Sequence, residues 1–302
     1  MPYSHPTDTT KASLLPIFAI LGAVILWGGS FPATKFVLQY LDTAPLMWAR
    51  TFVALMVMLP LMRRVRPQRI TKKDLPLLLG MVICEPCLYF LCETRALQLT
   101  TSSQAGVISA SLPLMLAFGG WLILKEKVSR FLWIGVAISC TGVAALTLVS
   151  SAPTEAAPNP VLGNMLEIAA MACAAGSTIC VSKLVHRKEA PWNPVMLTIM
   201  QCGSGFLFFS TGAMEVITEF HTWPIALIGS VLYLGIGASL IAFILYHWSL
   251  SRLPASHVGC FINLIPVAAI FFGWLTLGEE LSFAQAMAVL VIMAGVTLGS
   301  RK

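Results

Sequence analysis

The sequence predicts an all-α membrane protein with ten transmembrane helices, arranged as two inverted five-helix repeats. Of its 302 residues, 57% are hydrophobic and 11% are charged, and the mean hydropathy is +0.83. Water-soluble domains carry about a quarter charged residues, which coat their surface. In this chain the charged residues instead lie in short connectors between long apolar runs, and one apolar segment recurs in the second half. These observations exclude a water-soluble enzyme.

Ten apolar segments are long enough to cross a membrane. A bilayer core of about 30 Å requires about 20 apolar residues in helical form. Helices are expected because lipid offers no hydrogen-bond partner to an open backbone. In chain order, the predicted spans are residues 17–38, 46–62, 75–97, 104–124, 131–149, 161–182, 195–214, 223–248, 255–277 and 282–299.

The start of the chain decides whether its first apolar run counts as a span, and the middle of the chain shows where the spans divide into two halves. The stretch up to Lys11 is short and polar, and no Ala-x-Ala-like cleavage site follows it, so the first apolar run is expected to be retained as a helix. Residues 150–160 are rich in Ser, Ala and Pro, as in a linker. The predicted domains are a first repeat, residues 1–152, and a second, inverted repeat, residues 153–302.

The basic residues predict the direction of the spans. Sixteen of the nineteen Lys and Arg residues fall on the inner side when both termini are placed in the cytoplasm. Membrane proteins carry their excess of basic residues in cytoplasmic loops. The net charge of +6 is therefore a topology signal and not a nucleic-acid surface, because no nucleic-acid-binding motif accompanies it. A multi-pass protein of the inner or plasma membrane is expected.

An internal repeat relates the two halves. A shift of 153 positions lays residues 97–143 on 250–296 with fourteen identities in forty-seven pairs, including Pro113 with Pro266 and Glu126 with Glu279. Each half holds five spans, and this odd number makes the second copy enter the membrane from the opposite face. Two inverted copies give two conformations of similar energy, open to one side or the other, which is the basis of alternating access. The repeat therefore predicts a transporter.

A set of motifs extends over nearly the whole chain. It comprises Trp-Gly-Gly-Ser at 27–30 with Lys35, then Pro45 and Arg50, and the paired Pro and Glu segments of the repeat. With these motifs the sequence resembles the drug/metabolite transporter superfamily, specifically its ten-span EamA-like exporters. Lys125 stands where that family usually has glycine, a minor departure in a loop. The resemblance implies a carrier that moves small metabolites such as amino acids or drug-like compounds, usually outward, without fixing the substrate.

Carboxyl groups inside the spans are candidates for function. An acid at mid-membrane costs on the order of 3 kcal/mol to insert unless it faces protein or water. Glu85 lies near the middle of the third span and is followed by Pro86, which removes a backbone donor and is expected to bend the helix. Glu85 and Glu167 are candidates for substrate contact and proton coupling. The alternatives are a protonated Glu85 bonded between helices and a Glu167 that reaches the interface.

Prolines at matching positions mark the middle of each repeat. Pro113 and Pro266 lie mid-span, near Ser109 and Asn263, and helix breaks at matching places in two repeats indicate a binding site at the midplane. The alternative is a pair of tolerated kinks inherited from one duplication. Two serines that follow matching glycines complete the set of substrate-binding candidates: Ser30 and Ser177.

Aromatic and cationic side chains add further candidates for substrate contact. Trp27, Tyr89 and Tyr246 are expected to form an aromatic wall for an apolar or ring-bearing solute, although such residues near span ends also form interfacial belts. Lys35 and Arg50 lie toward the outer ends of the first two spans, where they would attract a carboxylate. An ordinary snorkelling pair is the alternative. Lys35 is included among the substrate-binding candidates.

No cofactor, metal or catalytic residue is expected. The eight cysteines fall inside apolar spans, where a thiol behaves as a small buried hydrophobe, and Cys84 and Cys87 have metal spacing without a partner pair. His-Glu-x-x-His and Gly-x-Ser-x-Gly do not occur. The expected partners are a small-molecule substrate and the lipid bilayer, without nucleic acid. The sequence does not decide whether the protein forms a homodimer.

Two other functions are alternatives to a metabolite exporter. A sugar-phosphate or nucleotide-sugar exchanger of the same superfamily would need more bases at the cavity than Lys35 and Arg50 supply. A membrane-embedded enzyme would build an acid–base or metal site from four side chains: Cys84, Glu85, His247 and His257.

Overall fold

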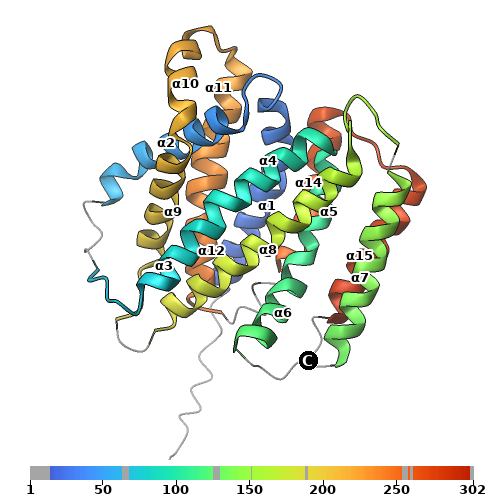
Figure 1. Ribbon diagram of the computed structural model, residues 1–302, viewed down its shortest axis with the longest axis horizontal. Coiled ribbons are helices and arrows are strands. Elements are labelled where there is room, and N and C mark those ends of the chain that lie inside the picture. The colour runs from blue at the N-terminus through green and yellow to red at the C-terminus, as the bar shows by residue number, and fades with distance from the viewer. Residues whose placement is uncertain are drawn as a thin grey trace, which may run out of the picture.

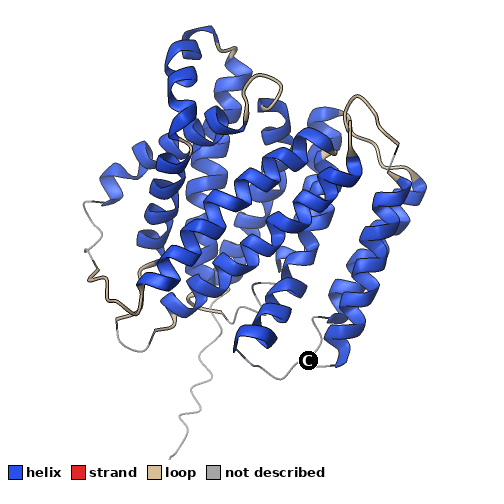
Figure 2. Cartoon of the chain, in the orientation of Figure 1, coloured by secondary structure: helices blue, strands red, loops and turns tan. Residues whose placement is uncertain are grey.

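The structure is a computed structural model that describes residues 14–62, 68–124, 130–150, 152–187, 190–253, 258 and 261–299 (Figure 1). Within these ranges the regular elements are helices, and the only β-type contact is an isolated bridge between Thr154 and Ala157 (Figure 2). The predicted all-α class is confirmed. Several residues used in the sequence analysis lie outside the described ranges, namely Glu126, His257 and the basic residues at 11, 63, 64, 66, 125, 127, 188, 301 and 302.

Helices occupy the predicted apolar segments, but ten membrane spans are not confirmed by the described residues. The first half forms α1 (Leu15–Val37), α2 (Thr43–Met62), α3 (Leu75–Val82), η1 (Ile83–Leu88), α4 (Tyr89–Leu99), α5 (Ser102–Ile108), η2 (Ser109–Ser111), α6 (Leu112–Leu124) and α7 (Arg130–Val149). The second half forms α8 (Pro160–Val185), α9 (Pro194–Phe208), η3 (Ser210–Gly212), α10 (Ala213–Glu219), η4 (Phe220–Thr222), α11 (Ile225–Leu232), η5 (Tyr233–Ile241), α12 (Ala242–Leu250), α14 (Ile265–Leu277) and α15 (Phe283–Gly299). The η1 and η5 segments are π-helical, and the other η segments are 3₁₀ turns.

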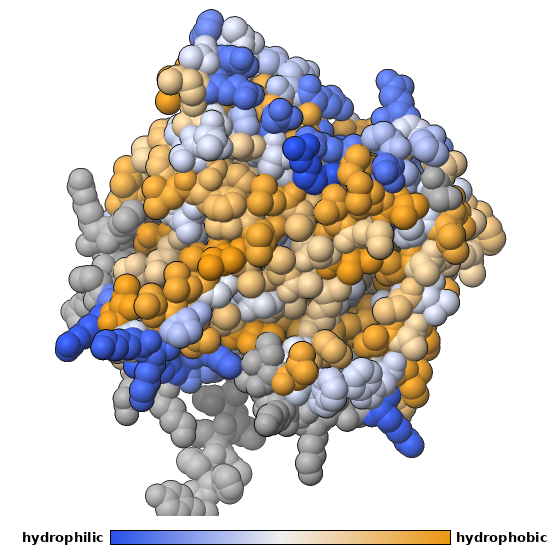
Figure 3. Space-filling view, in the orientation of Figure 1, coloured by the Kyte–Doolittle hydropathy of each residue, from blue (hydrophilic) through white to orange (hydrophobic). Residues whose placement is uncertain are grey.

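The described helices have the length and surface of a multi-pass membrane protein. Five are long and apolar enough to cross a membrane: Leu15–Val37, Thr43–Pro60, Leu75–Leu99, Pro160–Val185 and Ile225–Leu250. A bent pair, α9 with Ser210–Thr222, makes a sixth if it counts as one span. An apolar belt crosses the middle of the face shown in Figure 3, between polar ends. Such a belt is the surface that lipid covers.

The third predicted span is one helix with a break at its centre. Glu85 is extended, with φ −147° and ψ 119°, and the π-helical η1 replaces regular α-helical turns around it. Pro86 has no N–H to continue the α-helical hydrogen bonds. The expected bend is therefore confirmed. The Glu85 carbonyl oxygen instead accepts a hydrogen bond from Gln201 Nε2 at 3.2 Å.

The two mid-span prolines also lie beside breaks. The 3₁₀ turn η2 ends two residues before Pro113, between α5 and α6. A turn at residues 263–264 likewise precedes α14, whose first turn contains Pro266. A proline ring restricts the residue before it and removes a donor, so regular helix ends or restarts there. Because 109–111 shifts onto 262–264, the breaks occupy matching positions in the two halves.

The seventh span was predicted as one straight helix over residues 195–214, followed by a non-helical connector. The part of this prediction after residue 208 is wrong. The helix bends by 57° after Phe208 and stays helical as far as Thr222. At the bend, Gly212 lies against the start of α2, where a Cβ atom would come within 2.2 Å of the Pro45 nitrogen. This close approach takes the chain off the axis of α9, and composition alone does not reveal it.

Two equivalent helices, α7 and α15, pack against each other (Figure 1). A Cβ atom at Gly142 would lie 2.8 Å from the Ile292 nitrogen, and one at Gly295 would lie 2.5 Å from the Ser139 nitrogen. These residue numbers rise along one helix as they fall along the other, so the helices run antiparallel. Under the shift of 153, Gly142 becomes Gly295 and Ser139 becomes Ile292. The two contacts are therefore images of each other.

The first helix, α1, lies at the centre of the bundle and joins its parts (Figure 1). Its residues Ile20, Val24 and Phe31 belong to the largest buried apolar cluster. Gly28 allows α14 to approach, because a Cβ atom there would lie 2.3 Å from Ala268 Cβ. This contact carries Trp27 and its neighbours into the middle of the molecule.

Candidate functional site

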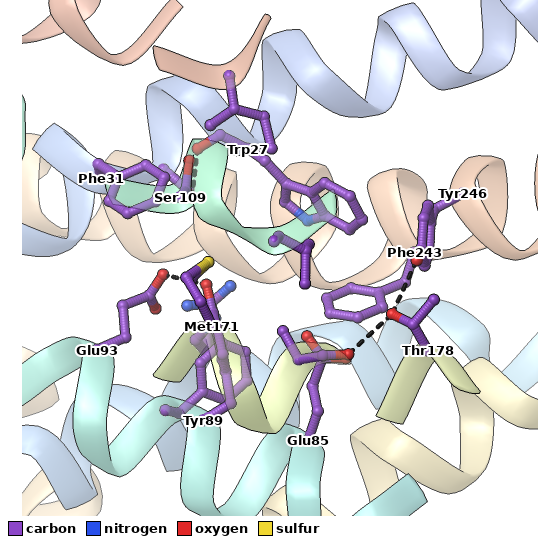
Figure 4. Close-up of a pocket in the computed structure, with 16 residues that line it drawn as sticks. Trp27, Phe31, Glu85, Tyr89, Glu93, Ser109, Met171, Thr178, Phe243 and Tyr246 are labelled. Carbon is purple, nitrogen blue, oxygen red and sulfur yellow. Dashed lines mark hydrogen bonds between the residues drawn. The ribbon is translucent and has the colours of Figure 1, made fainter. Parts of the chain in front are cut away.

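A cavity of about 50 Å³ lies between the central helices (Figure 4). Such a volume holds a few water molecules, so in this conformation it is too small for a metabolite. Both halves of the chain contribute to its walls. The lining side chains are Trp27, Ser30, Phe31, Arg50, Glu85, Tyr89, Phe90, Glu93, Ser109, Leu112, Met171, Ala174, Thr178, Phe243, Tyr246 and Ile265.

Many of these lining residues occur in equivalent pairs. Leu112 becomes Ile265 under the shift of 153, and both line the cavity. The same shift pairs Phe90 with Phe243 and Glu93 with Tyr246, which also line the cavity. A slightly smaller offset of 147 relates Gly29-Ser30 to Gly176-Ser177. This offset pairs two more sets of lining residues, Trp27 with Ala174 and Phe31 with Thr178. Matching positions of the two halves therefore face the same space.

The broken third helix supplies two carboxyl groups. Glu85, Tyr89 and Glu93 are spaced four residues apart, and all three line the cavity. Glu85 stands at the break, beside Ser177 and Gln201, and Gln201 Nε2 donates to its backbone carbonyl at 3.2 Å. The Tyr89 hydroxyl donates to Glu93 Oε1 (Figure 4). The Tyr89 contact satisfies a carboxylate that would be costly to leave unpaired inside a membrane.

An aromatic cluster forms the opposite wall. The Trp27 ring packs edge-on against Phe243 and Tyr246, with ring centres 5.3 and 5.1 Å apart, and its Nε1 donates to the Ala238 carbonyl at 3.2 Å. The Tyr246 hydroxyl is 2.9 Å from Thr178 Oγ1 (Figure 4). Because their polar atoms are satisfied elsewhere, these rings present apolar faces to the cavity.

Arg50 supplies a positive charge to the cavity wall. It is buried, its Nε donates to Ser239 Oγ at 2.8 Å, and its guanidinium lies 4.4 Å from the centre of the Phe90 ring. Arg50 also interacts electrostatically with Glu93 and Glu85. Hydrogen bonding, stacking and nearby acids together offset the desolvation of a buried cation. The cavity thus offers a guanidinium and two carboxyl groups beside aromatic rings.

Six residues predicted from the sequence line this cavity. They are Trp27, Ser30, Glu85, Tyr89, Ser109 and Tyr246. The hydroxyls of the two serines donate to carbonyls of their own helices, Ser30 to Trp27 at 2.7 Å and Ser109 to Gly106 at 2.6 Å. Rotation of either hydroxyl would free it for a solute.

Lys35 is not among the residues that line this cavity. Its Nζ donates to the carbonyl oxygens of Leu97 at 2.9 Å, Thr100 at 2.5 Å and Ala156 at 2.8 Å. Two of these carbonyls belong to the end of α4, where the last C=O groups of a helix lack intrahelical partners and attract a cation. In this conformation Lys35 binds the end of α4, and its contact with a solute stays a prediction.

The other predicted residues lie next to the cavity or behind it. Pro113 and Pro266 each follow a lining residue directly. Ser177 accepts from Gln201 Nε2 at 3.3 Å, in the layer behind Glu85. Asn263 is buried at the turn before α14, and its Oδ1 has no partner among the described residues. Glu167 is fully buried on α8, so it does not reach the interface.

Several lining residues were not among the predicted candidates. Glu93 is the charged one, and Phe90, Thr178 and Phe243 complete the walls, whereas Arg50 was considered from the sequence together with Lys35. Glu93 follows Glu85 by eight residues, a helical spacing, which was a usable signal. Phe243 precedes Tyr246 by one helical turn, and the repeat shift relates it to Phe90. Thr178 is related to Phe31 by the offset of 147, but nothing else in the sequence sets it apart from the neighbouring small polar residues.

The fold and the site define a class of protein before any comparison. An all-helical, multi-pass membrane protein whose two halves face a central charged and aromatic cavity is a membrane transporter. The comparisons agree. The EamA-like transporter family matches residues 14–148 and 161–301, and the chain belongs to this family.

The relatives of the chain are named as transporters. It is 25% identical over 282 residues to the uncharacterized transporter YetK of Bacillus subtilis, covering 92% of this chain and 84% of YetK. It is 25% identical to the uncharacterized transporter YvbV of the same organism, covering 97% and 92%. One solved crystal structure aligns with a TM-score of 0.65 at 17% identity, over 96% of this chain and 99% of that one. The latter likeness supports the fold.

Proposed function

We propose that the protein exports small metabolites, such as amino acids or drug-like compounds, by alternating access. In this proposal ten spans form two inverted halves, residues 1–152 and 153–302, with both termini in the cytoplasm of an inner or plasma membrane. The observation that carries the proposal is the set of equivalent residues facing one cavity. A site shared by two inverted copies can be exposed to either side by the same rearrangement, performed by one half or the other.

The antiparallel packing of α7 and α15 supports the inverted relation. Contacts between equivalent residues occur where a twofold axis passes, and helices related by an axis in the membrane plane run in opposite directions. In this conformation the cavity measures only about 50 Å³. Export from this state requires the helices around Glu85 and Trp27 to separate.

The composition of the cavity supports an amphipathic, charged solute. Aromatic rings favour an apolar or ring-bearing portion, Arg50 favours a carboxylate, and Glu85 favours an amine or another cationic group. A zwitterionic amino acid with an aromatic side chain satisfies all three. A cationic drug-like compound satisfies two.

The proposal is tested with pure, full-length protein in lipid vesicles. A panel of labelled L-amino acids, nucleosides and drug-like cations is offered, and we expect transport of at least one amphipathic member above protein-free vesicles. The Arg50→Lys variant keeps the charge but loses the planar guanidinium. Transport of carboxylate-bearing members is expected to fall about tenfold, since a charge-assisted hydrogen bond contributes about 1.5 kcal/mol.

The matched control is Arg95→Lys, because Arg95 is exposed and bonded to Gln98 on its own helix. This variant should transport like the unchanged protein. Equal movement of every panel member in protein-containing and protein-free vesicles would contradict a transport function.

Anion transport by the Lys35→Ala variant distinguishes a sugar-phosphate or nucleotide-sugar exchanger from the proposed exporter. A sugar-phosphate or nucleotide-sugar exchanger needs several cations at the solute, and Lys35 is occupied by three carbonyl oxygens. We expect Lys35→Ala to lower stability without selective loss of anion transport. A selective loss of anion transport would support the exchanger.

The enzyme alternative has less support. The relatives are named transporters, which is consistent with a non-enzymatic protein. Among the described residues, His, Cys, Asp and Glu side chains form no group of three that could hold a metal ion. His247 is buried against Thr198, with Nδ1 and Oγ1 3.0 Å apart. Stoichiometric zinc in the purified protein would favour the enzyme.

A further inference from the structure

Glu279 joins the two halves of the chain through its carboxylate. Its Oε1 accepts a hydrogen bond from the Ser102 N–H at 2.9 Å. Its Oε2 accepts from the Ser102 hydroxyl at 2.9 Å, the Ser103 N–H at 2.8 Å and the Ser103 hydroxyl at 2.6 Å. Hydrogen bonds to an ionised carboxylate are roughly twice as strong as neutral ones. These bonds therefore make a strong link between the connector after α14 and the start of α5.

The end of α14 directs Glu279 toward these serines. Gly278 ends the helix in the left-handed conformation, with φ 64°, and the Glu279 N–H donates to the Gly273 carbonyl at 3.3 Å. Glycine adopts this conformation without steric cost, so the chain turns back beside its own helix. Gly273 leaves room for the contact, because a Cβ atom there would lie 2.9 Å from Ser103 Oγ and 3.0 Å from Glu279 Oε2. Both glycines therefore fit the Glu279 contact.

The serine side of the contact is held in place by other helices. Thr100, just before α5, donates its hydroxyl to Asn164 Oδ1 on α8 at 2.9 Å, and its carbonyl oxygen accepts from Lys35 on α1. The Thr101 side chain accepts a hydrogen bond from the Gln104 N–H at 3.2 Å, which caps α5. Because the start of α5 is fixed to α1 and α8, we expect a separation to move Glu279 and not the serines.

The helices α5 and α14 pack against each other between the cavity and the Glu279 contact (Figure 1). Ser109, directly after α5, and Ile265, the first residue of α14, both line the cavity. Further along, a Cβ atom at Gly106 would lie 2.2 Å from Ala269 Cβ. Residue numbers fall on one side as they rise on the other, so the two segments run antiparallel. The Glu279 contact thus closes the far end of this α5–α14 seam.

The α5–α14 seam is closed along its length. At Gly106 the two helices are too close for a side chain between them, so a solute cannot pass there. Ser102 and Ser103 are only 0% and 2% exposed, so water scarcely reaches their hydroxyls. A solute in the cavity can leave along this seam only if α5 and α14 separate. That separation breaks the hydrogen bonds between Glu279 and the serines.

We propose that Glu279, Ser102 and Ser103 form a latch that keeps the α5–α14 seam closed toward the outer side of the membrane, and that solute leaves when this latch opens. The inference rests on the proposed transport function and on its orientation, which puts Glu279 at the outer end. When the latch opens, water replaces the serine donors at the carboxylate and replaces Glu279 at the serines. This exchange makes the contact reversible.

The latch is tested by the labelling rate of a cysteine in the cavity wall. Ser109→Cys is introduced into the full-length protein, which is purified in detergent and treated with a charged maleimide. This reagent is larger than the cavity of about 50 Å³, so it reaches the cysteine only after the cavity opens. Adding Glu279→Gln should speed labelling about tenfold, since loss of one charge-assisted hydrogen bond shifts an opening equilibrium by about that factor. Peptide mass spectrometry separates this cysteine from the native thiols.

Glu280→Gln is the matched control for the change of charge. It removes the same charge one residue further on, and Glu280 is exposed, so labelling should keep the rate of Ser109→Cys alone. Gly273→Ala opens the latch by a second route, because its methyl group crowds the serine hydroxyls while every charge stays. It should also speed labelling. Gly203→Ala, whose Cβ atom meets nothing within 4 Å, should not.

A second reporter, Met58→Cys, distinguishes opening of the latch from unfolding. Met58 is 0% exposed, and its apolar cluster contains Ala54 and Leu240 but no residue of the α5–α14 seam. The latch variants should leave its labelling unchanged. Equal labelling of Ser109→Cys with and without Glu279→Gln, or faster labelling of both reporters, would overturn the latch.

Intact cells show toward which side the latch opens. Membrane-impermeant maleimide added outside should label Ser109→Cys faster when Glu279→Gln is present. Acceleration that appears only after permeabilisation would overturn opening toward the outer side. The labelling needs no solute, so absence of transport by every member of the panel would contradict the proposed function and leave the latch standing.

Discussion

Lys35 and Arg50 show how one sequence signal divides between two roles. Both are basic, both lie near the ends of apolar spans, and the sequence offered the same alternatives for each. In the structure, Lys35 binds carbonyl oxygens at the end of α4, and Arg50 faces the cavity and stacks on Phe90. The two roles differ because a helix end with free carbonyl oxygens lies within reach of Lys35, whereas the cavity lies within reach of Arg50. Which groups each side chain reaches depends on how the helices pack.

At the residue scale, the ion pair of Asp74 and Arg187 ties the start of α3 to the end of α8, outside the spans. Arg187 Nη1 donates to both carboxylate oxygens of Asp74, at 2.6 and 2.8 Å, and Thr71 donates through its N–H and its hydroxyl. Desolvation opposes ionisation, but these hydrogen bonds and the nearby guanidinium outweigh it and lower the pKa of Asp74 below its usual range.

This lowered pKa predicts acid-dependent stability. A depressed folded-state pKa contributes stability above the unfolded value, about 3.9, which is lost as pH falls through the folded pKa. We expect Asp74→Asn to lower the Tm of the detergent-solubilised protein at pH 7 by about 2 °C, since interfacial ion pairs contribute about 1 kcal/mol or less. Below pH 4 the difference from the unchanged protein should shrink.

The control for this prediction is Asp42→Asn, because Asp42 is exposed near the start of α2. Thermal unfolding measured from pH 3 to pH 8 should show no comparable change in that variant. Parallel pH profiles for Asp74→Asn and the unchanged protein would contradict the role of the ion pair.

At the element scale, prolines predicted where helices break better than glycines predicted where helices bend. Pro86, Pro113 and Pro266 indicated helix breaks correctly, because a proline removes a backbone donor from its own helix. Pro32, by contrast, lies inside the continuous helix α1. The 57° bend after α9 was missed, because it depends on the approach of Gly212 to the start of α2. A glycine indicates that close contact is available, without naming the partner.

The close approach of Gly142 in α7 to Ile292 in α15 predicts how a larger residue at position 142 would affect stability. In Gly142→Ala, the new methyl group would lie 2.7 Å from Ile292 Cγ1 and 2.8 Å from the Ile292 nitrogen. Backbone cannot rotate away as a side chain can, so overpacking is expected to cost about 1–3 kcal/mol. The Tm of the variant in detergent should fall by about 2–10 °C.

Gly203→Ala is the matched control, because a Cβ atom there meets nothing within 4 Å. This variant should unfold at the same temperature as the unchanged protein or slightly above it, since alanine favours the helix. Equal destabilisation by both variants would contradict the close packing of α7 on α15.

At the scale of the whole molecule, charge asymmetry predicts the direction of insertion. Lys72 and Glu155 are both exposed and lie in connectors at opposite ends of the described bundle. We expect a membrane-impermeant maleimide to label Glu155→Cys in intact cells and Lys72→Cys after permeabilisation, since basic loops stay in the cytoplasm. Protein without an added cysteine controls for labelling of the native thiols.

The labelling pattern also tests the number of spans between the two positions. Because α3 to α7 separate them, labelling of both from one side would mean an even number of crossings and would contradict the inverted arrangement of the halves. The opposite pattern, with Lys72→Cys labelled first, would reverse the orientation.

The sequence by itself determined that lipid surrounds this protein, where its helices lie, that they break near Pro86, Pro113 and Pro266, and which segments of its two halves match. These properties follow from composition, from apolar length and from identities at a fixed shift, which need no tertiary contact. Only the tertiary structure decided that Glu93 and Arg50 share the cavity with Glu85, that Lys35 binds carbonyl oxygens at the end of α4, and that the buried Glu167 carboxyl has no hydrogen-bond partner among the described residues. Those outcomes depend on the register and crossing of helices distant in sequence, because side chains meet only once those helices are packed.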